Sequence, residues 1–419
     1  MLPPILRRSL VVAAAVAGVI APPASAATTR YLSPGGSDAA SGTRKAPCRT
    51  FARAYRAAHP GSAVILRGGD YGGQTLSNLP PKPGAAKIVF RPARGGNVRL
   101  GPLRIDNTQN VEVRDIRATG WGVSNGAAHV VLRNIAVTDV SGAAGYFSGA
   151  HDVRVIGGEI ARVDPQDAIH MNAHHGHNTN IVIDGLFVHD LTRFRNPSSH
   201  NDCLQAGDVA NLRIVNSRFV NCGTQGVFLN PYGGGTTRDI TIENSWFGPA
   251  QLGYNALYVG GAVNVLVRNN SFAHGAHIDS PGSRTSMIGN IFQGMSGYTC
   301  SLNARNSVEF AYNLTAERCR GASHHRVARR LASDFVNPSA ANAATFNLNL
   351  RRGAAAIDAG DPARSPATDY HGRARPAKRR PDIGAVEYGA GGRRRKPRGK
   401  RRASAAARIR SSHANRTRR

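Results

Sequence analysis

"NIVIDGLFVHD" (residues 180–190), "NLRIVNSRFVNC" (residues 211–222) and "NVLVRNNSFAH" (residues 264–274) share one pattern. Each has a short strand of alternating apolar residues, then a polar residue that is often Asn, then a second short apolar stretch. Copies recur through the middle of the chain at intervals of 19 to 31 residues, which is typical of a solenoid. Aligned on the first strand position, the copies begin at Val111, Val130, Val153, Ile181, Leu212, Ile240, Val265, Thr285 and Val308.

The repeat unit contains β-branched strands and no stretch long enough for a helix. The Leu-x-x-Leu-x-Leu signature of leucine-rich repeats is missing, so that class is excluded. One unit cannot bury its apolar face alone, but stacked units form a continuous Val, Ile and Leu core. The pattern therefore predicts an all-β parallel β-helix of about nine or more coils.

Asparagines recur at the turn between the two strands of the repeat. Asn tolerates left-handed dihedral angles, and side chains stacked at about 4.8 Å can form an amide ladder. We therefore interpret these asparagines as structural. They are Asn134, Asn216, Asn244 and Asn269, with Asn290 and Asn313 one place later.

The N-terminus predicts export. Arg7 and Arg8 precede a short apolar run, and Ala24-Ser25-Ala26 forms an A-x-A cleavage site, so residues 1–26 are expected to be a secretory signal peptide. No stretch is long enough to span a bilayer. We expect a secreted, monomeric protein that the cell wall can retain.

The C-terminus carries much of the formal net charge of +29: thirteen Lys and Arg, and no acid, lie between Arg393 and Arg419. Residues 391–419 have no apolar pattern and are predicted to be a disordered basic tail. Such a tail suits an anionic cell-wall polymer, and it predicts no specific binding of nucleic acid.

Five cysteines are present, and export permits disulfides. Cys203 and Cys222 are nineteen residues apart, as are Cys300 and Cys319, and the repeat places the first pair on adjacent coils. We expect two bonds, Cys203–Cys222 and Cys300–Cys319, with Cys48 left over.

With these features the chain, over residues 30–390, resembles right-handed parallel β-helix proteins of the pectate-lyase-like superfamily. Residues 31–71 resemble the cap at the start of secreted members, which implies a helix at Thr50–Ala58 and a first strand at Ala63–Arg67. Residues 354–389 resemble the ending of choice-of-anchor Q proteins. The resemblance rests on Ile357-Asp358-Ala359-Gly360, Asp369, Gly372, Arg375, Asp382-Ile383-Gly384-Ala385 and Glu387.

The resulting organisation is a signal peptide (1–26), a cap with first coils (27–105), the repeats (106–320), a C-terminal β-helix ending (321–390) and the tail.

A further set of strands lies between the copies: "QDAIHMN" (166–172), "NDCLQAG" (201–207), "TQGVFLN" (224–230), "YNALYVG" (254–260) and "HGAHIDS" (274–280). Aligning Ile169, Leu204, Val227, Leu257 and His277 as core residues predicts an outward column. That column reads His170, Gln205, Phe228, Tyr258 and Ile278. Asp167 and Asp202 precede the first two core residues by two places.

Polar residues and aromatic rings would thus stack on one surface, which predicts a groove for an extended polysaccharide. The longest repeat intervals also fall here, and solenoid insertions often form the loops of a binding face. One such insertion, at residues 190–200, carries Arg193 and Arg195. We expect Gln205, Phe228 and Tyr258 to bind substrate, with sugar rings on the aromatic faces.

The leading hypothesis is a polysaccharide lyase that cleaves a uronic-acid polymer by β-elimination. His170 or His200 suits the base, because histidine titrates near neutral pH, and Asp167 and Asp202 are the other candidate catalytic residues. The uronate carboxylate needs a cation. Calcium held by Asp164, Asp167 and Asp202 would supply it, or else Arg193 and Arg195.

Two alternatives stay open. Asp167 and Asp202 would lie about 5 Å apart on adjacent coils, near the separation of a retaining glycoside hydrolase pair. "DPQD" (164–167) is similar to the Asp-Pro-His-Asp of alginate epimerases, with Gln166 in place of the histidine. The third hypothesis is a non-catalytic glycan-binding or cell-surface protein.

Overall fold

The computed structural model describes residues 27–82, 84–191, 200–249, 255–279, 284–293, 308–319, 321–338 and 342–389. The predicted signal peptide and basic tail lie outside this part of the chain. Within it, no helix is long and apolar enough to cross a membrane.

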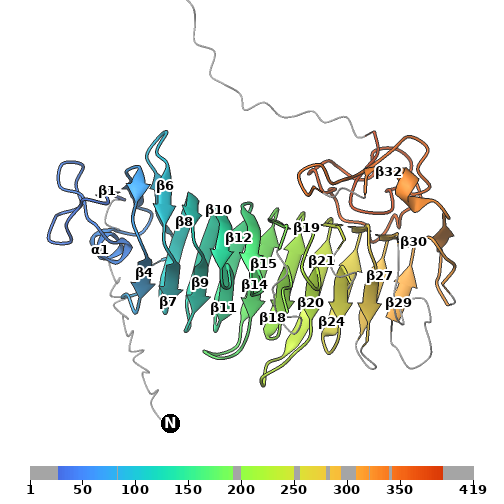
Figure 1. Cartoon of the computed structure of the whole chain (residues 1–419), viewed down its shortest axis with the longest axis horizontal. Helices are drawn as coiled ribbons and strands as arrows, with labels where there is room; N and C mark the ends of the chain where they lie inside the picture. The colour runs from blue at the N-terminus through green and yellow to red at the C-terminus, as the bar shows by residue number, and fades with distance from the viewer. Residues whose placement is uncertain are drawn as a thin grey trace, which may run out of the picture.

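Most of the described chain forms three ladders of parallel strands that wind around one core (Figure 1). The first ladder contains β1 (Thr29–Leu32), β2 (Ala63–Leu66), β5 (Ile88–Pro92), β8 (Gln109–Ala118), β10 (Ala128–Ser141), β12 (His151–Ile156), β15 (Thr179–Asp184), β18 (Val209–Val215), β21 (Thr237–Glu243), β24 (Val263–Arg268), β27 (Thr285–Ile288) and β29 (Val308–Ala311). The second contains β3 (Gly69–Asp70), β6 (Val98–Leu100), the later parts of β8 and β10, β13 (Glu159–Asp164), β16 (Phe187–His189), β19 (Arg218–Val220), β22 (Trp246–Phe247), β25 (Ser271–Phe272), β28 (Ile291–Phe292), β30 (Leu314–Thr315) and β31 (Arg326–Val327). The third contains β4 (Gln74–Ser77), β7 (Leu103–Asp106), β9 (Trp121–Ser124), β11 (Gly145–Ser148), β14 (Ile169–Met171), β17 (Leu204–Ala206), β20 (Val227–Leu229), β23 (Leu257–Val259) and β26 (Ala276–Ile278).

The predicted all-β parallel β-helix is confirmed. Strands that begin the sequence repeats pair in register: Ile181 lies opposite Leu212, and Leu212 lies opposite Ile240. Along each strand alternate side chains point inward, as in β15, where Ile181 and Ile183 are fully buried. The nine strands of the third ladder correspond to nine coils of the described chain.

Two columns of asparagine lie at the corner between the first and second ladders. In the outer column, Asn134 and Asn216 have positive φ and donate to Asp115 and Asp184 on the preceding coils. Asn290 and Asn313 belong to a buried column with Asn270. There each Oδ1 accepts from a backbone N–H one coil away, at 2.9 Å for Asn290 and 2.8 Å for Asn313. Both columns have structural roles, as the sequence predicted.

The predicted N-terminal helix is α1 (Phe51–Ala57), one residue shorter at each end than expected. Thr50 caps it by accepting from the backbone N–H of Arg53 at 3.2 Å. Phe51 is buried and stacks on Phe90 of β5, with ring centroids 4.5 Å apart. The helix therefore covers the start of the core, as Figure 1 shows.

The C-terminal segment packs against the outside of the second ladder, beside the last coils (Figure 1). It includes the short 3-10 helix η2 (Leu331–Asp334) and the antiparallel pair β32 (Phe335–Asn337) and β33 (Asn347–Leu350). Arg375 and Glu387, each 1% exposed, form an ion pair at 2.8 Å inside it. The rings of Tyr370 and Trp246 of β22 stack at 4.2 Å. The resemblance of this segment to choice-of-anchor Q endings stays a prediction.

We predict that Asn290→Ala lowers the free energy of unfolding by about 2–3 kcal/mol. The change leaves the buried N–H of Asn270 and the buried carbonyl of Val267 without their partner. Asn211→Gly is the control, because Asn211 is exposed and glycine accepts its positive φ; its effect should stay below about 1 kcal/mol. Urea unfolding followed by circular dichroism measures both. Equal effects would contradict a special role for the buried column.

Candidate active site

A column of outward-facing side chains runs along the third ladder. His170 of β14 lies opposite Gln205 of β17, and Gln205 opposite Phe228 of β20, which in turn lies opposite Tyr258 of β23. The predicted register is therefore confirmed for these four residues. The same column continues in the other direction through Tyr146, Gly122 and Arg104.

The prediction for the last coil is wrong. His277 faces outward opposite Tyr258, while Ala276 and Ile278 are buried. Burying an imidazole costs far more than burying a methyl group unless it gains hydrogen bonds, so Ala276 takes the core position.

His170 is held from both sides of its ring. Its Nδ1 lies 2.9 Å from Oδ2 of Asp167. Because a carboxylate only accepts, Nδ1 carries the proton, and Nε2 of the neutral ring is an acceptor. The hydroxyl of Tyr232 makes a short hydrogen bond to Nε2. Three residues thus form an Asp–His–Tyr chain in which Asp167 is buried and His170 is partly exposed.

A second histidine–aspartate pair lies beside the first. The backbone N–H of Asp202 donates to the other oxygen of Asp167 at 2.8 Å. Oδ1 of Asp202 accepts from the Thr224 hydroxyl and, at 2.7 Å, from the Gln225 N–H. Nδ1 of the exposed His200 lies 3.9 Å from Oδ2 of Asp202. The two pairs are therefore joined through one backbone hydrogen bond.

The electrostatics of this second pair favour a bound proton. Burial raises the pKa of the Asp202 carboxyl. That carboxylate in turn raises the pKa of His200. Both shifts favour a proton held between the two side chains.

Calcium binding by Asp164, Asp167 and Asp202 stays a prediction. Both oxygens of Asp167 and one of Asp202 are committed to donors from the protein. Among the described residues there is no group of three or more His, Cys, Asp or Glu side chains arranged to hold a metal ion. Asp164 ends β13, at a cis bond to Pro165.

The aromatic part of the column presents ring edges rather than faces. Phe228 and Tyr258 lie 4.9 Å apart between centroids, and Tyr258 and His277 lie 5.1 Å apart with nearly parallel planes. Because the rings stack on one another along the coil axis, their faces are largely occupied. The predicted packing of sugar rings on those faces would have to use the exposed edges and the Tyr258 hydroxyl instead.

A groove with a volume of about 730 Å³ adjoins His170 on the other side. Tyr146, which pairs with His170, forms one of its walls, and Arg104 lies in it. Arg104 is exposed and forms no ion pair with any residue that the structure describes. Arg193 and Arg195, the predicted carboxylate-binding residues, lie outside the described ranges.

Sequence reasoning missed Tyr232, Tyr146 and Arg104. Tyr232 lies in "NPYGGG" (230–235), outside the aligned strands, and its glycines were the available signal of a loop that folds back. The other two residues occupy outward positions in β7 and β11, which the aligned set of strands did not include.

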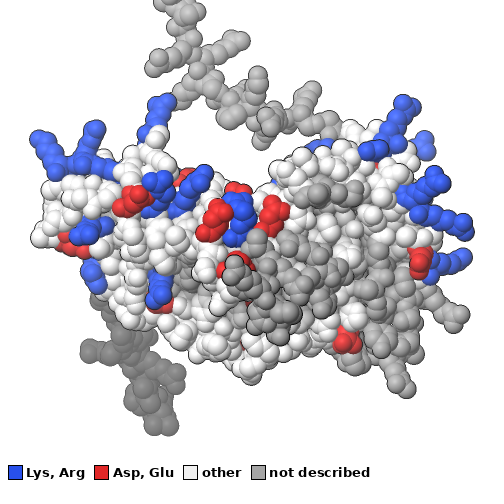
Figure 2. Space-filling view, viewed as in Figure 1, with Lys and Arg blue, Asp and Glu red and all other residues white. Residues whose placement is uncertain are grey.

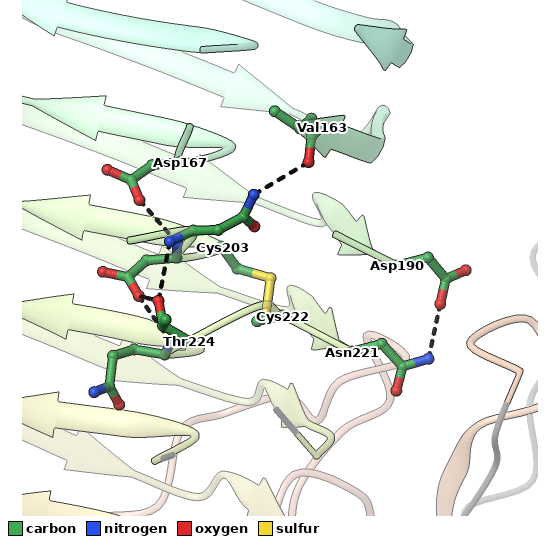
Figure 3. The surroundings of a disulfide bond; sticks show 10 residues. Val163, Asp167, Asp190, Cys203, Asn221, Cys222 and Thr224 are labelled. Atoms are coloured by element: carbon green, nitrogen blue, oxygen red, sulfur yellow. Dashed lines mark hydrogen bonds between the residues drawn. A yellow bond between two sulfur atoms is a disulfide. The ribbon is translucent and has the colours of Figure 1, made fainter. Parts of the chain in front are cut away.

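The Cys203–Cys222 disulfide is confirmed. It joins adjacent coils with Cα atoms 5.3 Å apart, and it lies close to Thr224 and Asn221 (Figure 3). Cys48 is buried and free, as expected. Cys300 lies outside the described residues, so the second predicted bond stays a prediction.

No protein-family model matches the chain, and no curated protein matches it significantly. Among solved structures the chain is similar to pectate lyase Pel9A, at 15% identity and a TM-score of 0.54, covering 87% of this chain and 97% of that one. It is also similar to XylC in its complex with xylose, at 10% identity and a TM-score of 0.54, covering 86% and 98%. At these identities the likeness establishes a shared parallel β-helix fold.

We predict that Asp202→Asn lowers the pKa of His200, because the substitution removes the negative charge that favours the imidazolium. NMR titration of the His200 ring measures the change. Asp152→Asn is the control, since Asp152 is exposed and its ion-pair partner is His129, at 3.4 Å, rather than His200. An unchanged His200 titration in Asp202→Asn would contradict the pairing.

Proposed function

We propose that the protein is a polysaccharide lyase acting on a uronic-acid-containing polymer. The observation that carries this proposal is the Asp167–His170–Tyr232 chain on the outer face of the third ladder, beside a groove. A carboxylate that orients a histidine, which in turn accepts from a hydroxyl, is the arrangement of a general base.

β-Elimination needs a base for the C5 proton, an acid for the leaving oxygen and a positive group for the uronate carboxylate. The His170 chain supplies the base. His200, whose pKa is raised by Asp202, lies on the neighbouring coil and suits the carboxylate or the leaving oxygen. Gln205 lies next to His170 in the column and offers a neutral hydrogen-bonding group. Arg104 offers a second cation in the adjoining groove.

The net positive charge of the chain favours a polyanionic substrate. On the face drawn in Figure 2, Lys and Arg gather at the two ends of the body, while the middle carries both signs. Charge would therefore contribute long-range attraction, whereas local recognition would depend on individual side chains such as Arg104 and His200.

The alternatives differ in how well the geometry supports them. A retaining hydrolase needs a carboxylate that reaches the anomeric carbon, but Asp167 and Asp202 are both buried and hydrogen-bonded. An epimerase begins with the same removal of the C5 proton, so the His170 chain would serve it equally. A glycan-binding protein needs only the groove and the column.

We place the protein outside the cell, where such polymers occur. The Cys203–Cys222 bond suits an oxidising compartment, and the predicted signal peptide would direct export.

We expect the secreted protein without its tail to release unsaturated uronate from one polymer among pectate, alginate and glycosaminoglycans. The product absorbs in the ultraviolet, so the assay is direct. His170→Ala should lower kcat/KM by at least about 100-fold, because it removes the proton acceptor of the Asp167–His170–Tyr232 chain. His59→Ala, in the loop before β2, is the matched control and should keep full activity.

Three other outcomes separate the alternatives. Inverted C5 configuration without cleavage would indicate an epimerase, and new reducing ends without absorbance would indicate a hydrolase. Binding that is saturable but leads to no chemistry would leave a glycan-binding protein.

A further inference from the structure

The atom of His170 that a substrate would need is covered. Nδ1 is bonded to Asp167, and Nε2 accepts from the hydroxyl of Tyr232. A substrate proton can therefore reach Nε2 only through the Tyr232 oxygen, or after Tyr232 has moved away.

Tyr232 is positioned by contacts that leave it little room to move. Its ring lies over Gly207, where a Cβ atom would come within 1.8 Å of a ring carbon. Its backbone N–H donates to the Gly207 carbonyl at 3.3 Å, and its carbonyl accepts from Gly235 at 3.0 Å. Asp208, which is buried, accepts from the Thr236 N–H at 3.0 Å and so fixes the end of the loop.

The loop of residues 230–236 thus carries Tyr232 back across two coils. Tyr232 follows β20, whereas His170 belongs to β14, two positions earlier in the third ladder. Simple stacking of neighbouring coils would not produce this contact, because stacked partners lie on adjacent strands. The absence of a side chain at residue 207 is what permits it.

We propose that Tyr232 is the catalytic residue that exchanges protons with the substrate, and that Asp167 and His170 act through it. This inference rests on the proposed lyase function. In the resting site the phenol is neutral, since burial raises the pKa of Tyr232. It can therefore donate to Nε2 while its oxygen keeps a lone pair for the substrate.

The proton transfers balance without a co-reactant. The C5–H bond of the uronate breaks, its proton goes to the Tyr232 oxygen, and the phenolic proton goes to Nε2 of His170. The C5–H electron pair forms the C4–C5 double bond, and the C4–O4 bond breaks. The leaving O4 then takes a proton from Tyr232, which regains one from His170. Asp167 stabilises the imidazolium that exists between the two transfers.

Tyr232→Phe tests this role, because it keeps the ring over Gly207 and removes only the hydroxyl. We expect kcat to fall by about 100- to 1,000-fold, with KM within about twofold of the wild-type value. Binding of the intact polymer to Tyr232→Phe, measured by calorimetry, should match wild type. If His170 were itself the base in contact with substrate, the substitution would uncover Nε2, and activity would be kept or would rise. That result would overturn the proposal.

Gly207→Ala tests the same contact from the other side. The backbone of Gly207 is not in the left-handed region, so alanine can adopt its conformation. The Cβ atom of that alanine would, however, push the Tyr232 ring away. We expect a loss similar to that of Tyr232→Phe, and no further loss in the double variant, because both changes remove the same group. Gly35→Ala is the matched control, since its Cβ would meet no atom within 4 Å.

Thermal unfolding of each variant checks the fold. Additive losses in the double variant would overturn the role given to Gly207. If Tyr232→Phe catalysed elimination at the wild-type rate, the role of Tyr232 would be overturned, but the lyase function would stand. Wild-type protein without elimination on any polymer would overturn the lyase function, and the Tyr232 step with it.

Discussion

Parallel stacking of coils at about 4.8 Å is the constraint on which the rest of the molecule depends. Each residue lies directly above its counterpart in the next coil, so any favourable contact between counterparts repeats along the axis. Inward columns are apolar and close-packed, as Ile181, Leu212 and Ile240 show. Corner columns are amides whose hydrogen bonds also run from coil to coil, as in the Asn270–Asn290 contact. The same geometry serves both apolar and polar contacts.

Stacking also explains how the candidate site is held. Asp167 and Asp202 occupy equivalent places on neighbouring coils, and the Asp202 N–H donates to Asp167 from one coil to the next. Each carboxylate then orients a histidine, His170 or His200. The site is therefore supported by the scaffold's own period. The Cys203–Cys222 bond joins coils at the same place and restrains their separation.

The contact between Tyr232 and His170 departs from that period, since it joins residues two coils apart. A departure of this kind costs loop entropy, and it requires that residue 207 carry no side chain where the Tyr232 ring lies. Aromatic residues that follow the period behave differently, because the rings of Phe228 and Tyr258 pack against each other. The similarity to pectate lyase Pel9A and to XylC is a similarity of scaffold, so functional inference has to rest on side chains such as Tyr232.

The sequence by itself determined the coil, the direction of alternate side chains, the corner asparagines and the Cys203–Cys222 bond. It could do so because each of these follows from local period and from stacking of equivalent positions. The helical cap was instead expected from the resemblance of residues 31–71 to other secreted β-helix proteins. It also placed His170 and Gln205 in one column. It failed at His277, where a short strand admitted two registers and only packing chose Ala276 for the core. Tertiary structure alone decided that Tyr232 meets His170, because that contact depends on how a glycine-rich loop folds across two coils, which no periodic pattern encodes.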